Sequence, residues 1–245
     1  MKKVLIVLCA VTVLGIGWLV VGKNNTAAPE TTSVKQAATF DKKQFSLDDP
    51  SSIWVIANKR NPLQPKEYTP ADLTVPNIPL RQARSGAEMQ LRAVAARALE
   101  AMAADAKQDG LDLMLSSGYR SYAYQMSLYN YYVNTQGKAA ADSQSARAGF
   151  SEHQTGLAAD VEPASRECEV EECFGDTPEG KWVAANAHTY GFIIRYPEGK
   201  QATTGYIYEP WHLRYVGKAL ATELHEQGIA TLEDFFGLGD APDYQ

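Results

Sequence analysis

The sequence predicts an α+β fold, in which a small antiparallel sheet is flanked by helices and follows an N-terminal transmembrane helix. Helical periodicities and capping residues dominate the first half of the folded part, whereas short apolar segments between glycine turns gather in its last third. This segregation of helices from strands is typical of α+β proteins. The 245 residues are 45% hydrophobic and 21% charged, as in ordinary globular chains.

The N-terminal segment, residues 1–23, is predicted to be a membrane anchor. Positions 4–22 carry no charge, and as a helix they would span about 28 Å, close to the hydrocarbon thickness of a bilayer. Lys2 and Lys3 would keep the N-terminus in the cytoplasm, so we expect a single-pass protein of the cell membrane with an extracytoplasmic domain. The alternative is a cleaved signal peptide and a secreted protein, although this run exceeds the usual apolar core of about 7 to 15 residues.

A linker and one domain follow the anchor. Residues 24–50 are small, polar and interrupted by proline, which predicts a flexible linker. The domain is expected over residues 51–240, starting with a strand-like segment near Ser52.

Helices are predicted first in this domain. A capping box at residues 85–88 precedes apolar residues at helical spacing, and Gly110 ends that helix. Alternating leucines at 111–115 predict a short strand. Ser121 can cap a further helix that ends at Gly137.

Strands are predicted mainly after a helix that Thr177-Pro178 opens and Gly191 ends. A last helix is expected between Gly217 and Gly228. The intervening apolar segments predict strands at 192–196, 205–209 and 211–216.

Charge and cysteine content narrow the function classes. The net charge of −6 argues against nucleic acid as a partner, because duplex binding needs a basic face. Cys168 and Cys173 lie in one acidic loop, and two such thiols outside the cytoplasm usually pair. We therefore expect a Cys168–Cys173 disulfide, with a soft-metal site as the alternative.

Two histidines lie in motifs that also carry carboxylates. His153 occurs in SEHQTGLAAD, which ends at Asp160, and His212 follows Glu209 in EPWH. Two imidazoles and a carboxylate form a usual ligand set for catalytic Zn²⁺, which leaves a fourth position for water. Glu209 would then remain as the base that deprotonates this water. His188 and His225 are assigned structural roles, because both lie in helical patterns without a carboxylate motif.

Three longer motifs carry a family resemblance. The segments SGYRSYAYQMSLYNYYV, SARAGFSEHQTGLAADV and TGYIYEPWHLRYVG resemble the VanY-type D-alanyl-D-alanine carboxypeptidases, and the likeness extends over about residues 52–235. These zinc peptidases trim the stem peptides of peptidoglycan. The resemblance implies one Zn²⁺ per chain, held by His153, Asp160 and His212. It implies Glu209 as catalytic base and Arg120 as the residue that stabilises the oxyanion.

The resemblance also implies residues that contact the substrate, with weaker role assignments. These positions are Gln125, Ser145, Arg147 and Ser151. Many members of the family carry proline after the arginine, whereas this chain has Ala148 there. The departure concerns the stiffness of that loop and leaves the chemistry unchanged.

The function expected from the sequence is removal of the C-terminal D-alanine from peptidoglycan stem peptides by a zinc-dependent D-alanyl-D-alanine carboxypeptidase, acting as a monomer. One alternative is an L,D-carboxypeptidase that acts on tetrapeptide stems with the same residues. Another is a peptidoglycan-binding module without activity, which the intact Glu209 disfavours.

Overall fold

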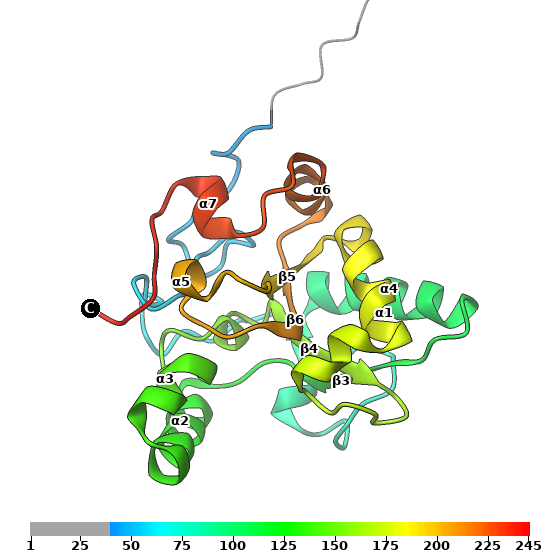
Figure 1. Cartoon of the computed structure of the whole chain (residues 1–245), viewed down its shortest axis with the longest axis horizontal. Coiled ribbons are helices and arrows are strands. Elements are labelled where there is room, and N and C mark those ends of the chain that lie inside the picture. Colours follow the sequence, from blue (N-terminus) through cyan, green and yellow to red (C-terminus); the bar gives the residue numbers. More distant parts are fainter. Residues whose placement is uncertain (1–39) are drawn as a thin grey trace, which may run out of the picture. The chain divides into compact units, whose positions relative to one another are not determined.

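The computed structural model describes residues 40–245, and a four-stranded antiparallel sheet lies at its centre (Figure 1). The strand order is β3-β4-β6-β5, and every neighbouring pair is antiparallel. The prediction of an α+β fold with a small antiparallel sheet is therefore confirmed. The sheet consists of β3 (Leu113–Ser117), β4 (Ala158–Pro163), β5 (Phe192–Tyr196) and β6 (Glu209–Tyr215). A separate pair consists of β1 (Leu73–Thr74) and β2 (Leu91–Arg92).

Seven α-helices surround the sheet within the described residues. In Figure 1, α1 and α4 lie at the right of the sheet, whereas α2 and α3 form a pair at the lower left. The helices are α1 (Ala93–Gln108), α2 (Tyr122–Gln136), α3 (Lys138–Gln144), α4 (Pro178–Asn186), α5 (Gln201–Thr204), α6 (Lys218–Gln227) and α7 (Leu232–Phe236). Short 3₁₀ helices are η1 (Ala87–Met89), η2 (Glu152–Thr155), η3 (Glu172–Asp176) and η4 (Ala187–Tyr190).

Two apolar clusters hold these elements together. In the larger one, Leu99 of α1 packs with Leu115 of β3 and Leu213 of β6, and all three are fully buried. Burial of one such leucine contributes about 1.5–3 kcal/mol. The smaller cluster surrounds Trp54, whose indole Nε1 donates to the Val216 carbonyl at 2.8 Å. The sheet that carries the polar motifs is thus supported by tightly packed side chains.

The predicted helix starts at Ser121 and Thr177 are confirmed, together with the predicted end of α6 at Gly228. The Ser121 hydroxyl accepts from the Tyr124 amide, and the Thr177 hydroxyl accepts from the Gly180 amide. Both side chains therefore satisfy amides that lack a partner in the first helical turn. Gly228 adopts a left-handed conformation at the end of α6.

Three local predictions are wrong. The segment from Ser52 that was expected to begin the domain as a strand is irregular, because the Val55 amide closes a turn onto the Ser52 carbonyl instead of pairing with another strand. The capping box predicted at 85–88 does not form, since Gly86 precedes the 3₁₀ turn η1 and no side chain caps it. The helix α1 begins only at Ala93, because the intervening β2 pairs with β1 and buries Leu91. The segment 205–209 is not a strand before Glu209. Gly205 has a φ of +84° after α5, and the Ile207 amide donates to the carbonyl of Ser143 in α3 instead of to a sheet neighbour.

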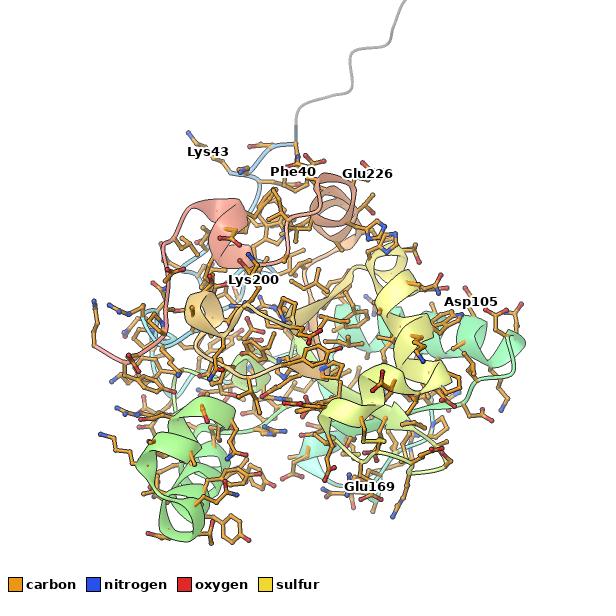
Figure 2. All side chains as sticks on the ribbon, viewed as in Figure 1. Phe40, Lys43, Asp105, Glu169, Lys200 and Glu226 are labelled. Atoms are coloured by element: carbon orange, nitrogen blue, oxygen red, sulfur yellow. A yellow bond between two sulfur atoms is a disulfide. The ribbon has the colours of Figure 1, made fainter. Side chains whose placement is uncertain are left out.

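The predicted anchor, residues 1–23, lies outside the described residues, as does most of the predicted linker. The linker's last part is described: Phe40 stacks on Trp54 with ring centroids 5.5 Å apart. Among residues 40–245, no helix combines the length and the apolar character needed to cross a membrane. Figure 2 shows Phe40 where the described chain begins, and Asp105, Glu169 and Glu226 at the periphery.

Candidate active site

A cleft of about 500 Å³ contains all five residues predicted for metal binding and catalysis. His153 comes from η2 and Asp160 from β4, while Glu209 and His212 both come from β6. Arg120 reaches the cleft from the connection between β3 and α2. Segments that are distant in the sequence thus converge on one cavity, as the motifs predict.

The sheet register explains how three of the elements meet. Asp160 on β4 lies directly opposite His212 on β6, and Ser117 on β3 lies opposite Asp160 on its other side. Directly opposed residues in antiparallel strands have Cβ atoms about 4.5–5.5 Å apart. The turn at Gly156, with a φ of +67°, connects η2 to β4 and brings His153 to the same place.

The three predicted ligands form a compact donor group. His153 Nε2 lies 3.3 Å from Asp160 Oδ2, and His212 Nδ1 lies 3.1 Å from Asp160 Oδ1. One donor atom from each residue lies within 4.8 Å of the others, and all three side chains are buried. Asp160 Oδ1 accepts no hydrogen bond within residues 40–245. Two imidazole nitrogens beside a carboxylate oxygen without a hydrogen bond fit a zinc ion.

The protonation states of two ligands also suit metal binding. Burial, aided by the Arg120 guanidinium, lowers the pKa of His153 to about 4. Burial opposes the charge of Asp160, but His153 and Arg120 outweigh it and hold its pKa well below the usual range. A neutral imidazole and an ionised carboxylate are the forms that coordinate a metal.

His212 differs because a second carboxylate lies near it. Burial opposes its charge, but Asp160 and Glu152 together raise the pKa of His212 to about 9. A metal that binds here must therefore displace a proton from His212 at neutral pH.

The position and the pKa of Glu209 both suit a general base. Its side chain is 8% exposed, and its Oε2 lies 3.7 Å from His212 Nδ1. Burial is the main cause that raises the pKa of Glu209 to about 8. A base with a pKa near neutrality both accepts and returns a proton readily. Tyr196 lies directly opposite Glu209 across β5 and β6, next to an irregularity in the strand pairing.

Arg120 lies beside the donor group. Its Nη2 bonds Asp160 Oδ2 at 2.7 Å, and its Nε donates to the Ser117 hydroxyl at 3.0 Å. A guanidinium stays charged at every relevant pH and offers several donors, which suits it to a developing negative charge.

The predicted substrate residues divide into two sets. Gln125, Ser145 and Ser151 line the cleft, and the Gln125 amide donates to the Ala146 carbonyl at 2.7 Å. Arg147 is not among the described residues that line it. The Arg147 guanidinium makes two bonds to Asp142, at 3.1 and 2.9 Å, and lies 3.9 Å from the centre of the Tyr244 ring.

Several cleft residues were missed by sequence reasoning. Tyr196 and Tyr206 contribute aromatic side chains to the wall of the cleft, and their signal was a place in or next to the strand motifs. Glu152 also lines the cleft, although the sequence analysis gave this neighbour of His153 no role. The acidic loop at 170–173 forms a further part of the wall.

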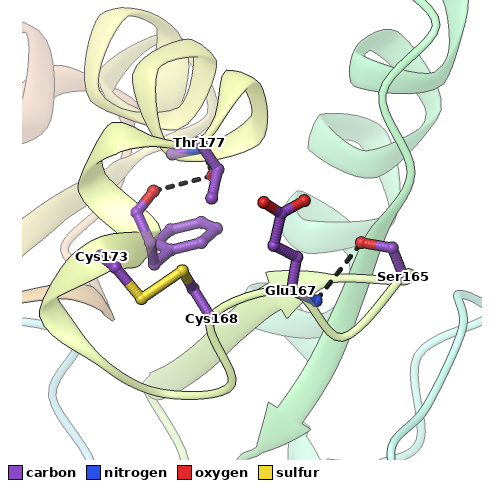
Figure 3. The surroundings of a disulfide bond; sticks show 7 residues. Ser165, Glu167, Cys168, Cys173 and Thr177 are labelled. Carbon is purple, nitrogen blue, oxygen red and sulfur yellow. Dashed lines mark hydrogen bonds between the residues drawn. A yellow bond between two sulfur atoms is a disulfide. The ribbon is translucent and has the colours of Figure 1, made fainter.

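The predicted disulfide closes this acidic loop. Cys168 and Cys173 are bonded, with Cα atoms 5.6 Å apart. Figure 3 shows the bond near Thr177, whose hydroxyl donates to the Phe174 carbonyl at 2.8 Å. The disulfide therefore closes the loop whose residues 170–173 form this wall of the cleft.

Comparison with known proteins identifies the family. The model of the family described as "VanY: D-alanyl-D-alanine carboxypeptidase" matches residues 88–218, more than half of the chain. The chain belongs to the VanY family. It is a zinc-dependent carboxypeptidase, and His153, Asp160 and His212 form its candidate zinc site.

Individual members of the VanY family agree over most of the chain. YodJ of Bacillus subtilis is 41% identical over 217 residues, which are 87% of this chain and 79% of the relative. The structure of the LdcB LD-carboxypeptidase is 43% identical, with a TM-score of 0.72, and the match covers 77% of this chain and 87% of LdcB. A Zn(II) complex of a mutant of the vancomycin resistance D,D-pentapeptidase VanY is 29% identical, with a TM-score of 0.61, over 74% and 97% of the two chains.

Proposed function

We propose that this enzyme removes the C-terminal D-alanine from peptidoglycan stem peptides by zinc-assisted hydrolysis. The buried His153–Asp160–His212 group, with Glu209 beside it in one cleft, supports this proposal most directly. A cleft of about 500 Å³ accommodates the end of a peptide, and its open side leaves room for the remaining polymer.

Different residues of the chain carry out different steps of the proposed hydrolysis. Zinc, when bound, supplies a Lewis acid that acidifies a water molecule and polarises the scissile carbonyl. Glu209 takes the proton of the attacking water and returns it to the amine of the departing D-alanine. Arg120 directs its positive charge toward the oxyanion that develops on the carbonyl oxygen. Both side chains are held in the cleft before substrate arrives, so little reorganisation is needed.

We propose that tetrapeptide stems are the preferred substrate, which makes the enzyme an L,D-carboxypeptidase. The support is its higher identity and TM-score with LdcB than with the D,D-pentapeptidase VanY. The second candidate is D,D-carboxypeptidase activity on pentapeptides, which the sequence motifs favoured. It is supported by a 30% identical relative from Enterococcus faecalis named D-alanyl-D-alanine carboxypeptidase.

The two specificities are separated by one experiment. The zinc-loaded enzyme is incubated in parallel with a tetrapeptide and a pentapeptide stem, and product masses are read by mass spectrometry. Loss of D-alanine from the tetrapeptide supports the L,D assignment, whereas loss from the pentapeptide alone supports the D,D assignment. A Glu209→Ala variant is the control for contaminating peptidases. If neither peptide is shortened by zinc-loaded enzyme, the proposed function is wrong.

We also propose that the domain works outside the cytoplasm and is held to the membrane by residues 1–23. The charged start of the chain, the uncharged run after it and the Cys168–Cys173 disulfide support this location. Protease treatment of intact, wall-stripped cells that express the full chain should remove the domain and leave a membrane-bound stub. Protection of the domain in intact cells would contradict the proposal.

A further inference from the structure

The second ring nitrogen of His212 faces a carboxylate that hydrolysis itself does not need. Nδ1 of His212 points to Asp160, whereas Nε2 lies 3.6 Å from Oε2 of Glu152. Both Nε2 and this Oε2 are buried and have no hydrogen-bond partner within residues 40–245. The separation is slightly longer than a hydrogen bond. Two buried polar atoms without partners therefore face each other next to the zinc-binding group.

Glu152 is held rigidly from its other side. Its Oε1 accepts from Arg195 Nε at 2.7 Å and from Arg214 Nη1 at 2.9 Å. Arg195 in turn makes two bonds to Glu233, at 2.8 and 2.6 Å. These four side chains are at most 1% exposed, and their two negative and two positive charges balance. The network thus keeps Glu152 charged and fixed while one of its oxygens remains directed at His212.

We propose that Glu152 is a positioning residue for zinc: its carboxylate accepts the Nε2–H of His212 and holds the tautomer whose Nδ1 lone pair faces the metal. Carboxylates behind metal-binding histidines orient the ring and raise its basicity. The inference does not depend on which stem peptide is hydrolysed.

The other zinc-binding histidine offers an internal comparison. His153 Nδ1 lies 2.6 Å from the Gly118 carbonyl, so its proton is held by a neutral acceptor and Nε2 is directed at Asp160. Each histidine therefore has one nitrogen directed at Asp160 and the other directed at an oxygen. Of these two histidines, only His212 has a charged acceptor at its second nitrogen. Removal of the charge of Glu152 should therefore weaken zinc binding.

A matched pair of variants separates this role from simple support of the fold. Glu152→Gln and Glu233→Gln each remove one charge from the same buried network, but only Glu152 faces His212. Zinc dissociation constants are measured at pH 7 by competition with a chromophoric chelator. Loss of a partner behind a metal-binding histidine weakens metal affinity by about 10- to 100-fold. We expect this loss in Glu152→Gln, and affinity near that of the unmodified enzyme in Glu233→Gln.

Three results would overturn the proposal. Unchanged zinc affinity in folded Glu152→Gln would do so, and so would an equal loss in both variants, which would indicate general damage to the network. Circular dichroism of both variants establishes which of them fold. The third test needs no variant: ¹⁵N NMR of the zinc-loaded enzyme should find the proton of His212 on Nε2. A proton on Nδ1, with Nε2 bound to the metal, would contradict the assignment even if neither variant folds.

Discussion

The four histidines of this domain form two pairs with opposite properties. His153 and His212 meet edge to face, with ring centroids 4.9 Å apart, and both are buried. His188 and His225 stack with centroids 3.6 Å apart and an interplanar angle of 5°, between η4 and α6. The stacked rings are closer together, yet among residues 40–245 only the first pair belongs to a group of possible metal ligands.

Proximity of two imidazoles is therefore insufficient for a metal site. Asp160 lies between His153 and His212, and each of their outer nitrogens faces an oxygen, from Gly118 or Glu152. The stacked pair has no carboxylate between its rings, and the Nδ1 of His188 has no hydrogen-bond partner in residues 40–245. A third ligand and fixed outer nitrogens distinguish the functional pair.

The largest expected effect is on zinc binding itself. His212→Ala removes a ligand and leaves Glu152 and Asp160 without a histidine between them, so zinc and peptide hydrolysis should both be lost. His225→Ala, in the stacked pair, should retain one zinc per chain and normal turnover. Atomic absorption of the two purified variants measures the difference. Equal zinc content in both would remove the distinction between the pairs.

The next largest effect is expected on the rate of hydrolysis when Glu209 is replaced. Glu209 lies in the same cleft as His153 and His212 but is not a predicted zinc ligand. Glu209→Gln preserves the shape of the side chain but cannot accept a proton from water. General base catalysis contributes about 10²- to 10⁴-fold, so kcat should fall by at least that range while zinc stays bound. Steady-state kinetics with metal analysis of the same preparation checks both parts. Near-normal turnover in a zinc-loaded variant would exclude Glu209 as the base.

The same comparison shows what the sequence could predict. The spacing of histidine and carboxylate in two motifs, together with the resemblance to the VanY-type carboxypeptidases, selected His153, Asp160, Glu209 and His212, and the structure brings these residues into one cleft. The absence of a carboxylate motif around His188 and His225 also distinguished this stacked pair from the predicted ligands. Each of these predictions rests on residues that lie within about ten positions of each other in one motif.

Long-range features could not be predicted in the same way. The ion pairs of Glu152 join residues 43 and 62 positions away, and no local pattern encodes such a network. Arg147 has a suitable charge for substrate, yet the structure pairs it with Asp142, five residues earlier, on the face of Tyr244. The capping box at 85–88 was overridden because strand pairing buries Leu91. Tertiary contacts decided the network of Glu152 and the start of α1, whereas Arg147 is held by a neighbour five residues away and by the ring of Tyr244.

A smaller effect is expected when the outer contact of His153 is disturbed. A Cβ at Gly118 would lie 2.3 Å from the Gln90 carbonyl oxygen, so Gly118→Ala must move the backbone whose carbonyl faces His153. Overpacking of this kind costs about 1–3 kcal/mol of stability, and we expect zinc affinity to fall by about tenfold. Gly86→Ala, where the nearest atom is 3.3 Å away, is the control. Chelator competition and urea unfolding test the two effects, and unchanged zinc affinity in Gly118→Ala would show that this contact is dispensable.

The smallest effect concerns the stacked pair and its response to pH. Burial, and then the nearby His225, lower the pKa of His188 below its ordinary value of 6.5, while Glu226 opposes the shift. The folded state therefore binds fewer protons than the unfolded state, and the stability that results is present above pH 6.5 and is lost as the pH falls through the folded pKa. His188→Gln removes this titration, so the melting temperature of the unmodified enzyme should fall more steeply than that of the variant between pH 7.5 and about 5. Zinc release at low pH lowers the melting temperature of both proteins equally, so it does not change the difference between their melting temperatures. A constant difference in melting temperature across this range would mean that the pKa of His188 is the same in the folded and unfolded states, which would contradict the prediction.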